Sequence, residues 1–166
     1  MGEGQPFKDG CGSGPGPWPG PFEPSIIAFT CAWCGYPSAV LAGVNRIEYP
    51  PGVMIVRVMC TGMIEPSYVM RALEYGADGV VIVGCQMENC HYMVGNKRAQ
   101  ERAEMLGPLL DMMGLGSGRL RTEWINASER VKFARAMRDF SEQLKKLGPN
   151  PLGLAGACGD GKEASR

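Results

Sequence analysis

Short apolar segments that alternate with longer helical stretches are the feature that most restricts the fold of this chain. The apolar segments are residues 26–30, 53–58, 79–83 and 120–125. Segments of this length bounded by turn residues are typical of strands, and strands alternating with helices are typical of a parallel sheet with right-handed βαβ crossovers. We therefore expect an α/β fold with an open, flavodoxin-like parallel sheet of about four strands in the order 2-1-3-4, flanked by helices.

The stretches between these segments carry the periodicity of amphipathic helices. Apolar residues recur at spacings of three and four at Ala99, Ala103, Leu106, Leu110 and Met113, and again at Phe133, Met137, Phe140, Leu144 and Leu147. Helix start and end signals agree with these stripes. Pro66 suits a first helical turn, and Asn126 with Glu129 resembles a capping box. Gly114 and Gly148 suit the C-terminal ends of helices.

Both ends of the chain differ in composition from the stretch between them. Residues 1–24 are rich in Gly and Pro around Cys11, and residues 150–166 are rich in Gly around Cys158. Such segments bury too little apolar area to offset the entropy of ordering them. We interpret residues 1–24 as a flexible arm, residues 25–149 as one folded α/β domain and residues 150–166 as a C-terminal tail.

The charge balance limits the partners of the chain. Lys plus Arg and Asp plus Glu both number 17, so the formal net charge is zero. Without a basic excess we expect no binding to nucleic acid or to a membrane surface. The apolar runs are a few residues long, against the roughly 20 that span a bilayer, and no apolar signal segment is expected at the N-terminus. The expected location is the cytoplasm.

Seven cysteines stand out in a chain expected in a reducing compartment, where clustered cysteines bind metal or do redox chemistry. Five of them follow the predicted strands: Cys31, Cys34, Cys60, Cys85 and Cys90. The C-terminal ends of parallel strands share one edge of a sheet, with neighbouring strands about 4.8 Å apart. The five thiols are therefore expected to converge at that edge, where helix N-termini favour thiolates.

A set of five thiols is compatible with three kinds of chemistry. An iron–sulfur cluster and a zinc site both take four sulfur ligands, although structural zinc sites usually show two closely spaced pairs. A thiol–disulfide oxidoreductase that uses Cys31 and Cys34 is the third, because a strand, a CxxC pair and a helix also begin thioredoxin-like motifs. The three remaining thiols count against that enzyme, since they would invite wrong disulfides. The spacing favours the cluster and leaves a zinc-stabilised adaptor and the dithiol enzyme as alternatives.

Other residues allow a functional and a plainer interpretation. His91, the single histidine, ligates iron, donates a hydrogen bond to a sulfur or packs as an ordinary structural residue. Trp33 shields the site from water or packs against the sheet. Gly114, Gly116 and Gly118 follow a helix and precede a strand, the reverse of a phosphate loop, so no nucleotide or flavin is expected. The eleven methionines form adaptable docking surfaces around the site or, as the preferred interpretation, fill the core.

Four segments together form a longer motif: residues 29–36 (FTCAWCGY), 57–62 (RVMCTG), 76–80 (GADGV) and 84–96 (GC, then CHY, then GN). This motif resembles the delta subunit of the methyl-viologen-reducing (F420-non-reducing) hydrogenase over nearly the whole predicted domain. The resemblance implies a non-catalytic electron-transfer subunit that carries a 2Fe-2S cluster. It implies electron transfer from a hydrogenase, or from a formate dehydrogenase in related complexes, to the flavin-containing A subunit of heterodisulfide reductase.

The resemblance also implies where the cluster is bound. Four of the five cysteines would be its ligands, drawn from Cys31, Cys34, Cys60, Cys85 and Cys90. Their positions next to these cysteines lead us to expect His91 and Trp33 beside the cluster. The sequence does not identify the surplus cysteine. Cys11 and Cys158 lie outside the motif.

Overall fold

A four-stranded parallel sheet forms the middle layer of the structure, a computed structural model that describes residues 22–156. Its strands are β1 (Ile26–Cys31), β2 (Val53–Val58), β3 (Gly79–Cys85) and β4 (Leu120–Ile125). They pair in the order β2-β1-β3-β4, which confirms the expected open α/β sheet and its 2-1-3-4 order. Strands β1 and β3 run slightly further than predicted, so that Cys31 and Cys85 are their last residues.

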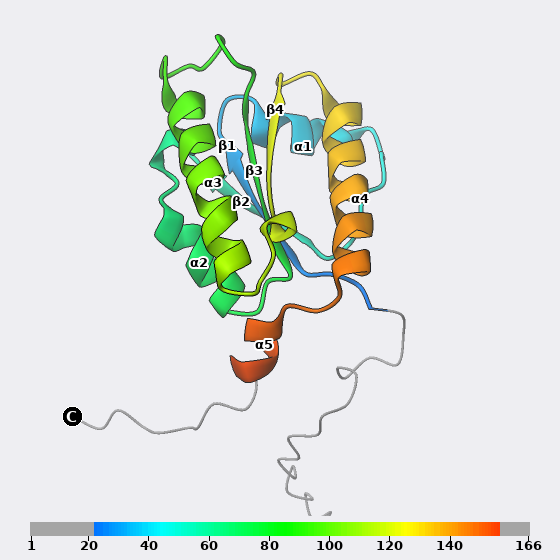
Figure 1. Ribbon diagram of the computed structural model, residues 1–166. Helices are drawn as coiled ribbons and strands as arrows, with labels where there is room; N and C mark the ends of the chain where they lie inside the picture. The colour runs from blue at the N-terminus through cyan, green and yellow to red at the C-terminus, as the bar shows by residue number, and fades with distance from the viewer. Residues whose placement is uncertain (1–21, 157–166) are drawn as a thin grey trace, which may run out of the picture.

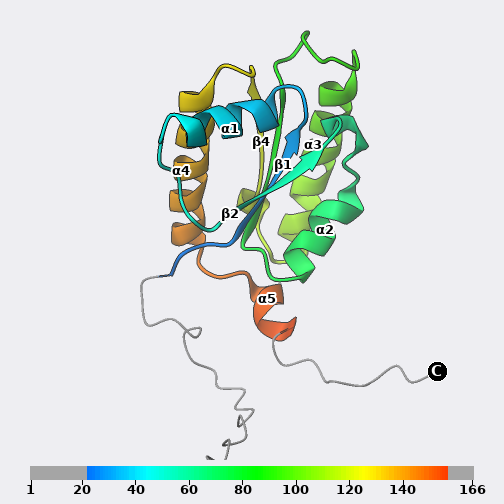
Figure 2. The ribbon, with the colours of Figure 1, turned by 180° about the vertical axis from the view of Figure 1, so that it is seen from behind.

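Helices cover both faces of this sheet, as Figures 1 and 2 show. Helices α2 (Pro66–Glu74) and α3 (Gly95–Met112) lie on one face, and α1 (Gly35–Val44) and α4 (Arg130–Leu147) lie on the other. Two short 3₁₀ turns, η1 (Thr61–Met63) and η2 (Ser117–Arg119), precede α2 and β4. The last described element is α5 (Pro151–Gly156), which lies within the segment predicted as a tail. Among the described helices, none is both long and apolar enough to cross a membrane.

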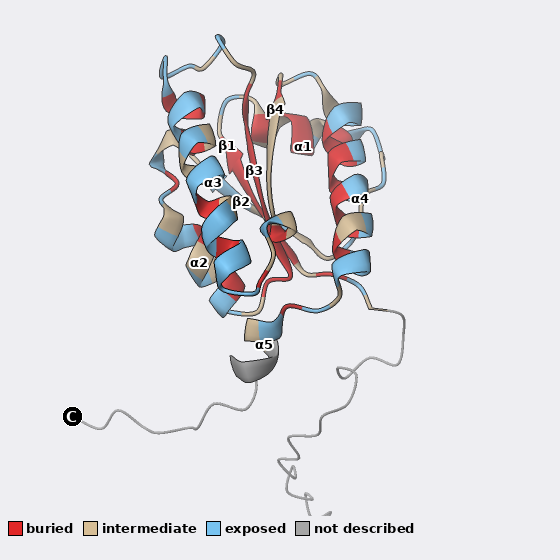
Figure 3. Ribbon diagram, viewed as in Figure 1, coloured by how far each residue is buried: buried red, intermediate tan, exposed pale blue. Residues whose placement is uncertain are grey.

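The core consists of two apolar layers, one on each side of β3, whose seven residues are all buried (Figure 3). The two predicted helical stripes supply most of the helix side of these layers, including Leu106 and Leu110 from α3 and Phe133 and Phe140 from α4. The final residue of each stripe is exposed instead, because it lies at the end of its helix or just beyond. Met113 is 48% exposed and Leu147 is 46% exposed.

The helix boundaries follow most of the signals in the sequence. Pro66 is the first residue of α2, and Gly114 and Gly148 follow α3 and α4 with φ angles of +76° and +79°, which suit glycine. The capping-box prediction is wrong about where α4 begins, since the helix starts at Arg130. The side chain of Glu129 still accepts the backbone N–H of Asn126 at 2.6 Å, but the hydrogen bond closes a loop before the helix.

A polar network closes the edge of the sheet opposite to the cysteines. The carboxylate of Asp78 accepts the backbone N–H groups of Ser25 and Asn150, both at 2.8 Å. The side chain of Arg119 donates to four backbone carbonyls, among them that of Asp78 at 2.9 Å. Asp78, which belongs to the GADGV segment, therefore stabilises the chain segment that leads into α5.

Some sequence predictions concern residues that the structure does not describe. Residues 1–21 and 157–166, with Cys11 and Cys158, lie outside the described residues. The division into an arm, a domain and a tail therefore stays a prediction.

Candidate metal centre

The five cysteines after the predicted strands lie at the C-terminal edge of the sheet, which is the upper edge in Figure 1. Cys31 and Cys85 end the adjacent central strands β1 and β3 and are 2% and 4% exposed. Cys34 caps the start of α1, Cys60 follows the edge strand β2, and Cys90 lies in the loop between β3 and α3. All five are free thiols. The strand order thus brings together residues up to 59 positions apart in the sequence.

Several sulfur atoms lie close to one another, and the thiol of Cys85 interacts with those of both Cys31 and Cys34. The Sγ atoms of Cys31 and Cys85 are 3.7 Å apart, which is far beyond a disulfide bond of about 2.05 Å. Two sulfurs bound to one tetrahedral metal at about 2.3 Å stand about 3.8 Å apart, so this spacing suits ligands that share a metal ion. Cys60 and Cys90 form a second group, because the Sγ atoms of both lie beside Gly95.

Backbone N–H groups point at several of these sulfurs. The N–H groups of Cys34 and Gly35, at the start of α1, both donate to the Sγ atom of Cys31 at 3.2 Å. The N–H of Gly62 donates to the Sγ atom of Cys60 at 3.4 Å. Such hydrogen bonds favour a charged sulfur over a neutral one. The helix ends at this edge therefore prepare the site for thiolate.

The pKa values of the thiols reflect their burial and the thiols next to them. Burial raises the pKa of Cys34, Cys60 and Cys85, and a charged Cys31 would raise all three further. Burial also acts to raise the pKa of Cys90, but backbone N–H groups in the first turn of α3 and at Tyr92 lower it overall. Several thiolates can coexist here only beside a positive charge, and a bound metal ion supplies one as it displaces the thiol protons.

Glycine and asparagine shape the floor of the site at the start of α3. A Cβ atom on Gly95 would lie closer than 3.0 Å to the Sγ atom of Cys60 and 3.3 Å from that of Cys90. A Cβ on Gly62 would likewise lie 2.7 Å from the Cα of Gly95. Fully buried Asn96 donates to the carbonyls of Cys85 at 3.1 Å and Gln86 at 2.8 Å. Only small residues at the two glycine positions allow the sulfurs and the loop to meet the helix.

Trp33 and His91 lie next to the cysteines and contact each other. Their rings stack with centroids 3.6 Å apart and an angle of 19° between planes, which joins the loop after β1 to the loop after β3. Tyr92 meets His91 edge-on, with the ring centroids 5.1 Å apart. Trp33 remains 43% exposed, so the stack forms part of the outer surface of the site.

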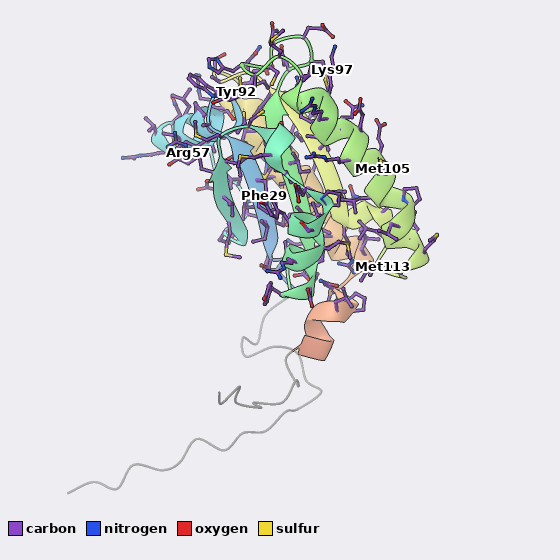
Figure 4. The ribbon with its side chains drawn as sticks, turned by 90° about the vertical axis from the view of Figure 1, so that its left-hand side faces the viewer. Phe29, Arg57, Tyr92, Lys97, Met105 and Met113 are labelled. Atoms are coloured by element: carbon purple, nitrogen blue, oxygen red, sulfur yellow. The ribbon has the colours of Figure 1, made fainter. Side chains whose placement is uncertain are left out.

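An exposed apolar rim surrounds this edge of the molecule. It consists of Trp33, Met59, Met63, Tyr92, Met93 and Val94, each between 43% and 82% exposed. Figure 4 shows Tyr92 at this end of the protein, at the opposite end of α3 from Met113. The interpretation of the methionines mainly as core filling is wrong, because seven of the described ones are exposed: Met54, Met59, Met63, Met93, Met105, Met112 and Met113. An apolar surface of this kind beside a site is typical of a protein-binding face.

Sequence reasoning missed one residue that contacts the site. The side chain of Arg102, in the middle of α3, donates to the carbonyls of Gly62 and Ile64, each at 2.9 Å. Its partners are 40 and 38 positions away, so no local pattern could have indicated it. The contact fastens the loop that carries Cys60 to α3.

The residues present suit a metal centre in their chemistry. Five thiols, N–H donors to sulfur and a 3.7 Å sulfur pair are the features that a tetrahedral thiolate site requires. As they stand, however, no three His, Cys, Asp or Glu side chains within residues 22–156 are grouped tightly enough to hold a metal ion. Side-chain rotations of the half-buried cysteines would be needed to complete a four-sulfur set.

Comparison with known proteins agrees with this chemistry. The family model described as "Methyl-viologen-reducing hydrogenase, delta subunit" matches residues 26–148. The vhc iron-sulfur subunit of an F420-non-reducing hydrogenase from Methanococcus voltae is 48% identical over 131 residues, which are 79% of this chain and 91% of that protein. The iron-sulfur subunit of an F420-non-reducing hydrogenase from Archaeoglobus profundus is 45% identical over 128 residues, 77% of this chain and 93% of that protein.

A third relative has a different architecture. The A subunit of the ferredoxin:CoB-CoM heterodisulfide reductase of Methanosarcina mazei is 42% identical over 126 residues. The similarity covers 76% of this chain but 16% of that protein. The same fold unit thus occurs both as a small separate protein and within a longer polypeptide.

Proposed function

The chain belongs to the methyl-viologen-reducing hydrogenase delta subunit family, and on that premise we propose that it carries a 2Fe-2S cluster and relays single electrons between a hydrogenase and a heterodisulfide reductase. The observation that carries this proposal is the convergence of five free thiols from three adjacent parallel strands, two of them 3.7 Å apart. A 2Fe-2S cluster needs four cysteine ligands and supplies a site that takes up and releases one electron.

The paired sulfurs support a particular ligand set. Cys31 and Cys85 form the first pair, and Cys60 and Cys90, which share contact with Gly95, form the second. Each pair would bind one iron. Cys34 is then the surplus cysteine, and it stays next to the site, because its thiol interacts with that of Cys85 and its backbone N–H donates to the sulfur of Cys31.

The chain's own residues would control access to this centre and its potential. The stacked rings of Trp33 and His91 cover one side of the thiol edge and limit the entry of water. Backbone N–H groups that donate to sulfur stabilise the more negative, reduced state. His91 stacks in this arrangement, which supports a covering role for it beside the ligands.

The partners in this proposal come from the relatives. Proteins named as hydrogenase iron-sulfur subunits match over nearly their full length, and the A subunit of a heterodisulfide reductase contains a similar segment. A unit found within the A subunit in one organism and as a separate chain in another is expected to work next to the A subunit in both. The donor is a hydrogenase, or a formate dehydrogenase in a related complex. The exposed apolar rim offers a surface for such partners, close to the thiols.

The structure offers little support for a thiol–disulfide oxidoreductase. Such an enzyme needs an accessible thiol with a lowered pKa in the Cys31–Cys34 pair. Cys31 is 2% exposed, and burial raises the pKa of Cys34. A zinc-stabilised adaptor would use the same four sulfurs, so metal analysis is what separates it from the electron carrier.

Electron transfer to the expected acceptor tests the function. The full chain, reduced anaerobically with dithionite and freed of excess reductant, is mixed with the purified A subunit of heterodisulfide reductase in a stopped-flow instrument. We expect the visible spectrum of the reduced protein to return to that of the oxidised form as the flavin bleaches. A protein that stays reduced beside the oxidised flavin would contradict the proposal.

Single Cys→Ser variants test the ligand set separately. Cys31→Ser, Cys60→Ser, Cys85→Ser and Cys90→Ser are expected to lose most of the bound iron or to change its spectrum. Cys34→Ser is the matched control, expected to keep the iron content and spectrum of the wild type. Loss of the cluster in Cys34→Ser, with retention in one of the others, would overturn the proposed pairs.

A further inference from the structure

The position of Cys60 is less secured by the sheet than those of Cys31 and Cys85. Cys31 and Cys85 are buried at the ends of the two central strands, whereas Cys60 follows β2, which pairs with only one neighbour. The residue before it, Met59, is 52% exposed, whereas the residue after it, Thr61, is buried. The backbone hydrogen bonds of its loop are local, from Met63 to Cys60 and from Ile64 to Thr61. The sheet alone therefore does not fix this sulfur.

Thr61 and Ile64 anchor this loop by burial, and the side chain of Arg102 adds two hydrogen bonds that join it to α3. Its Nη1 atom donates to the carbonyl oxygens of Gly62 and Ile64, both at 2.9 Å. These carbonyls lie two and four residues after Cys60, in the turn whose Gly62 N–H donates to the Cys60 sulfur. Gly62 is in turn packed on Gly95, the residue beside which the sulfur itself lies.

Arg102 forms no ion pair within the described residues, and its side-chain hydrogen bonds go to backbone carbonyls. A hydrogen bond from a charged donor is stronger than one between neutral groups. The guanidinium also leaves a positive charge next to the Cys60 loop. Arg98, one turn earlier on α3, is exposed, and its side chain makes no hydrogen bond within residues 22–156. It therefore carries the same charge without the contact.

We propose that Arg102 is a positioning residue that holds Cys60 in the metal centre by clamping its loop to α3. The proposal rests on the proposed function for the identity of the bound group, but the clamp itself is a property of the metal-free chain. Without the guanidinium, the turn at Gly62 loses its two side-chain hydrogen bonds to α3, and Cys60 becomes more mobile than in the wild type. The fold is expected to persist, because neither apolar core layer includes Arg102.

The clamp is tested first on the metal-free, full-length protein. Arg102→Gln removes the charged guanidinium, Arg102→Lys keeps the charge on a shorter side chain, and Arg98→Gln is the charge-matched control. Each protein is treated with iodoacetamide, and alkylation of each cysteine is followed by peptide mass spectrometry. We expect Cys60 to react several-fold faster in Arg102→Gln, an intermediate rate in Arg102→Lys, and no change at Cys34 or in Arg98→Gln. Equal acceleration at all thiols, or none at Cys60, would overturn the proposal.

The second readout uses the reconstituted protein. Arg102→Gln is expected to change the EPR line shape of the dithionite-reduced protein and to lower its midpoint potential relative to Arg98→Gln. Equal potentials and spectra in these two variants would overturn the positioning role. If the wild type bound no iron, the proposed function would be wrong. The alkylation rates of the metal-free protein would still test whether Arg102 positions Cys60.

Discussion

Gly95, the first residue of α3, is the position where one added methyl group probes the thiol arrangement most directly. The backbone of Gly95 does not have a positive φ angle, so alanine is compatible with its conformation. An alanine Cβ atom would nevertheless lie closer than 3.0 Å to the Sγ atom of Cys60, whereas ordinary contact begins at 3.4 Å. The Cys60 sulfur must therefore retreat by at least about 0.4 Å, twice the tolerance of about 0.2 Å in metal–ligand distances.

The substitution separates the metal centre from the fold. In the metal-free protein the thiol of half-buried Cys60 can rotate away from the new methyl group. Alanine is also a better helix residue than glycine, so we expect the free energy of unfolding to change by less than about 1 kcal/mol. In the loaded protein the sulfur cannot both rotate away and remain a ligand. Gly95→Ala should therefore keep its stability and lose most of its iron.

The assay is iron and sulfide content per chain after anaerobic reconstitution, together with urea denaturation of the metal-free protein. Gly43→Ala is the matched control, because Gly43 is also helical and a Cβ there would meet nothing within 4 Å. We expect Gly95→Ala to hold less than about half the iron of Gly43→Ala, since it disturbs one of four ligands. Full iron content in Gly95→Ala, with the wild-type EPR spectrum, would refute the reasoning.

Three further changes have expected outcomes. Asn150→Ala leaves the carbonyls of Leu73 and Ala77 without the amide that donates to both at 2.7 Å. It should lower the free energy of unfolding in urea by about 1–3 kcal/mol and leave the iron content unchanged. A lower iron content at unchanged stability would contradict the view that this edge of the sheet is independent of the thiol edge. Trp33→Ala removes the ring stacked on His91, so the visible absorption of the loaded protein should bleach faster in air, and an unchanged rate would disprove a covering role. Removal of the metal should leave the far-UV circular dichroism nearly intact, because both apolar layers form without it; a chain that unfolds with a chelator would contradict this.

The fold was predictable because its signals are local or periodic. The strand segments are short apolar runs, and a parallel sheet buried on both faces requires such runs at its centre, as β3 shows. The helical stripes were visible for the same reason. The start of α4 was misplaced because Asn126 and Glu129, the two residues of the expected capping box, form their hydrogen bond in a loop before the helix. A local motif does not reveal which of these two structures its surroundings select.

The site was predictable only in part. The position of the five cysteines followed from strand order, since the ends of parallel strands meet at one edge. The stack of Trp33 on His91 and the clamp by Arg102 depend on contacts between segments far apart in the chain, which sequence spacing does not encode. Core filling was preferred over a docking surface for Met59 and Met93, which are exposed, because methionine suits both a core and a binding surface.

The central claim, that the thiol edge holds a 2Fe-2S cluster, is tested most directly by chemical analysis and EPR of the anaerobically purified full chain. The account predicts about two irons and two acid-labile sulfides per chain, with an S = 1/2 signal that appears on reduction with dithionite. Zinc without sulfide, or a protein with no metal and an active Cys31–Cys34 pair, would contradict it.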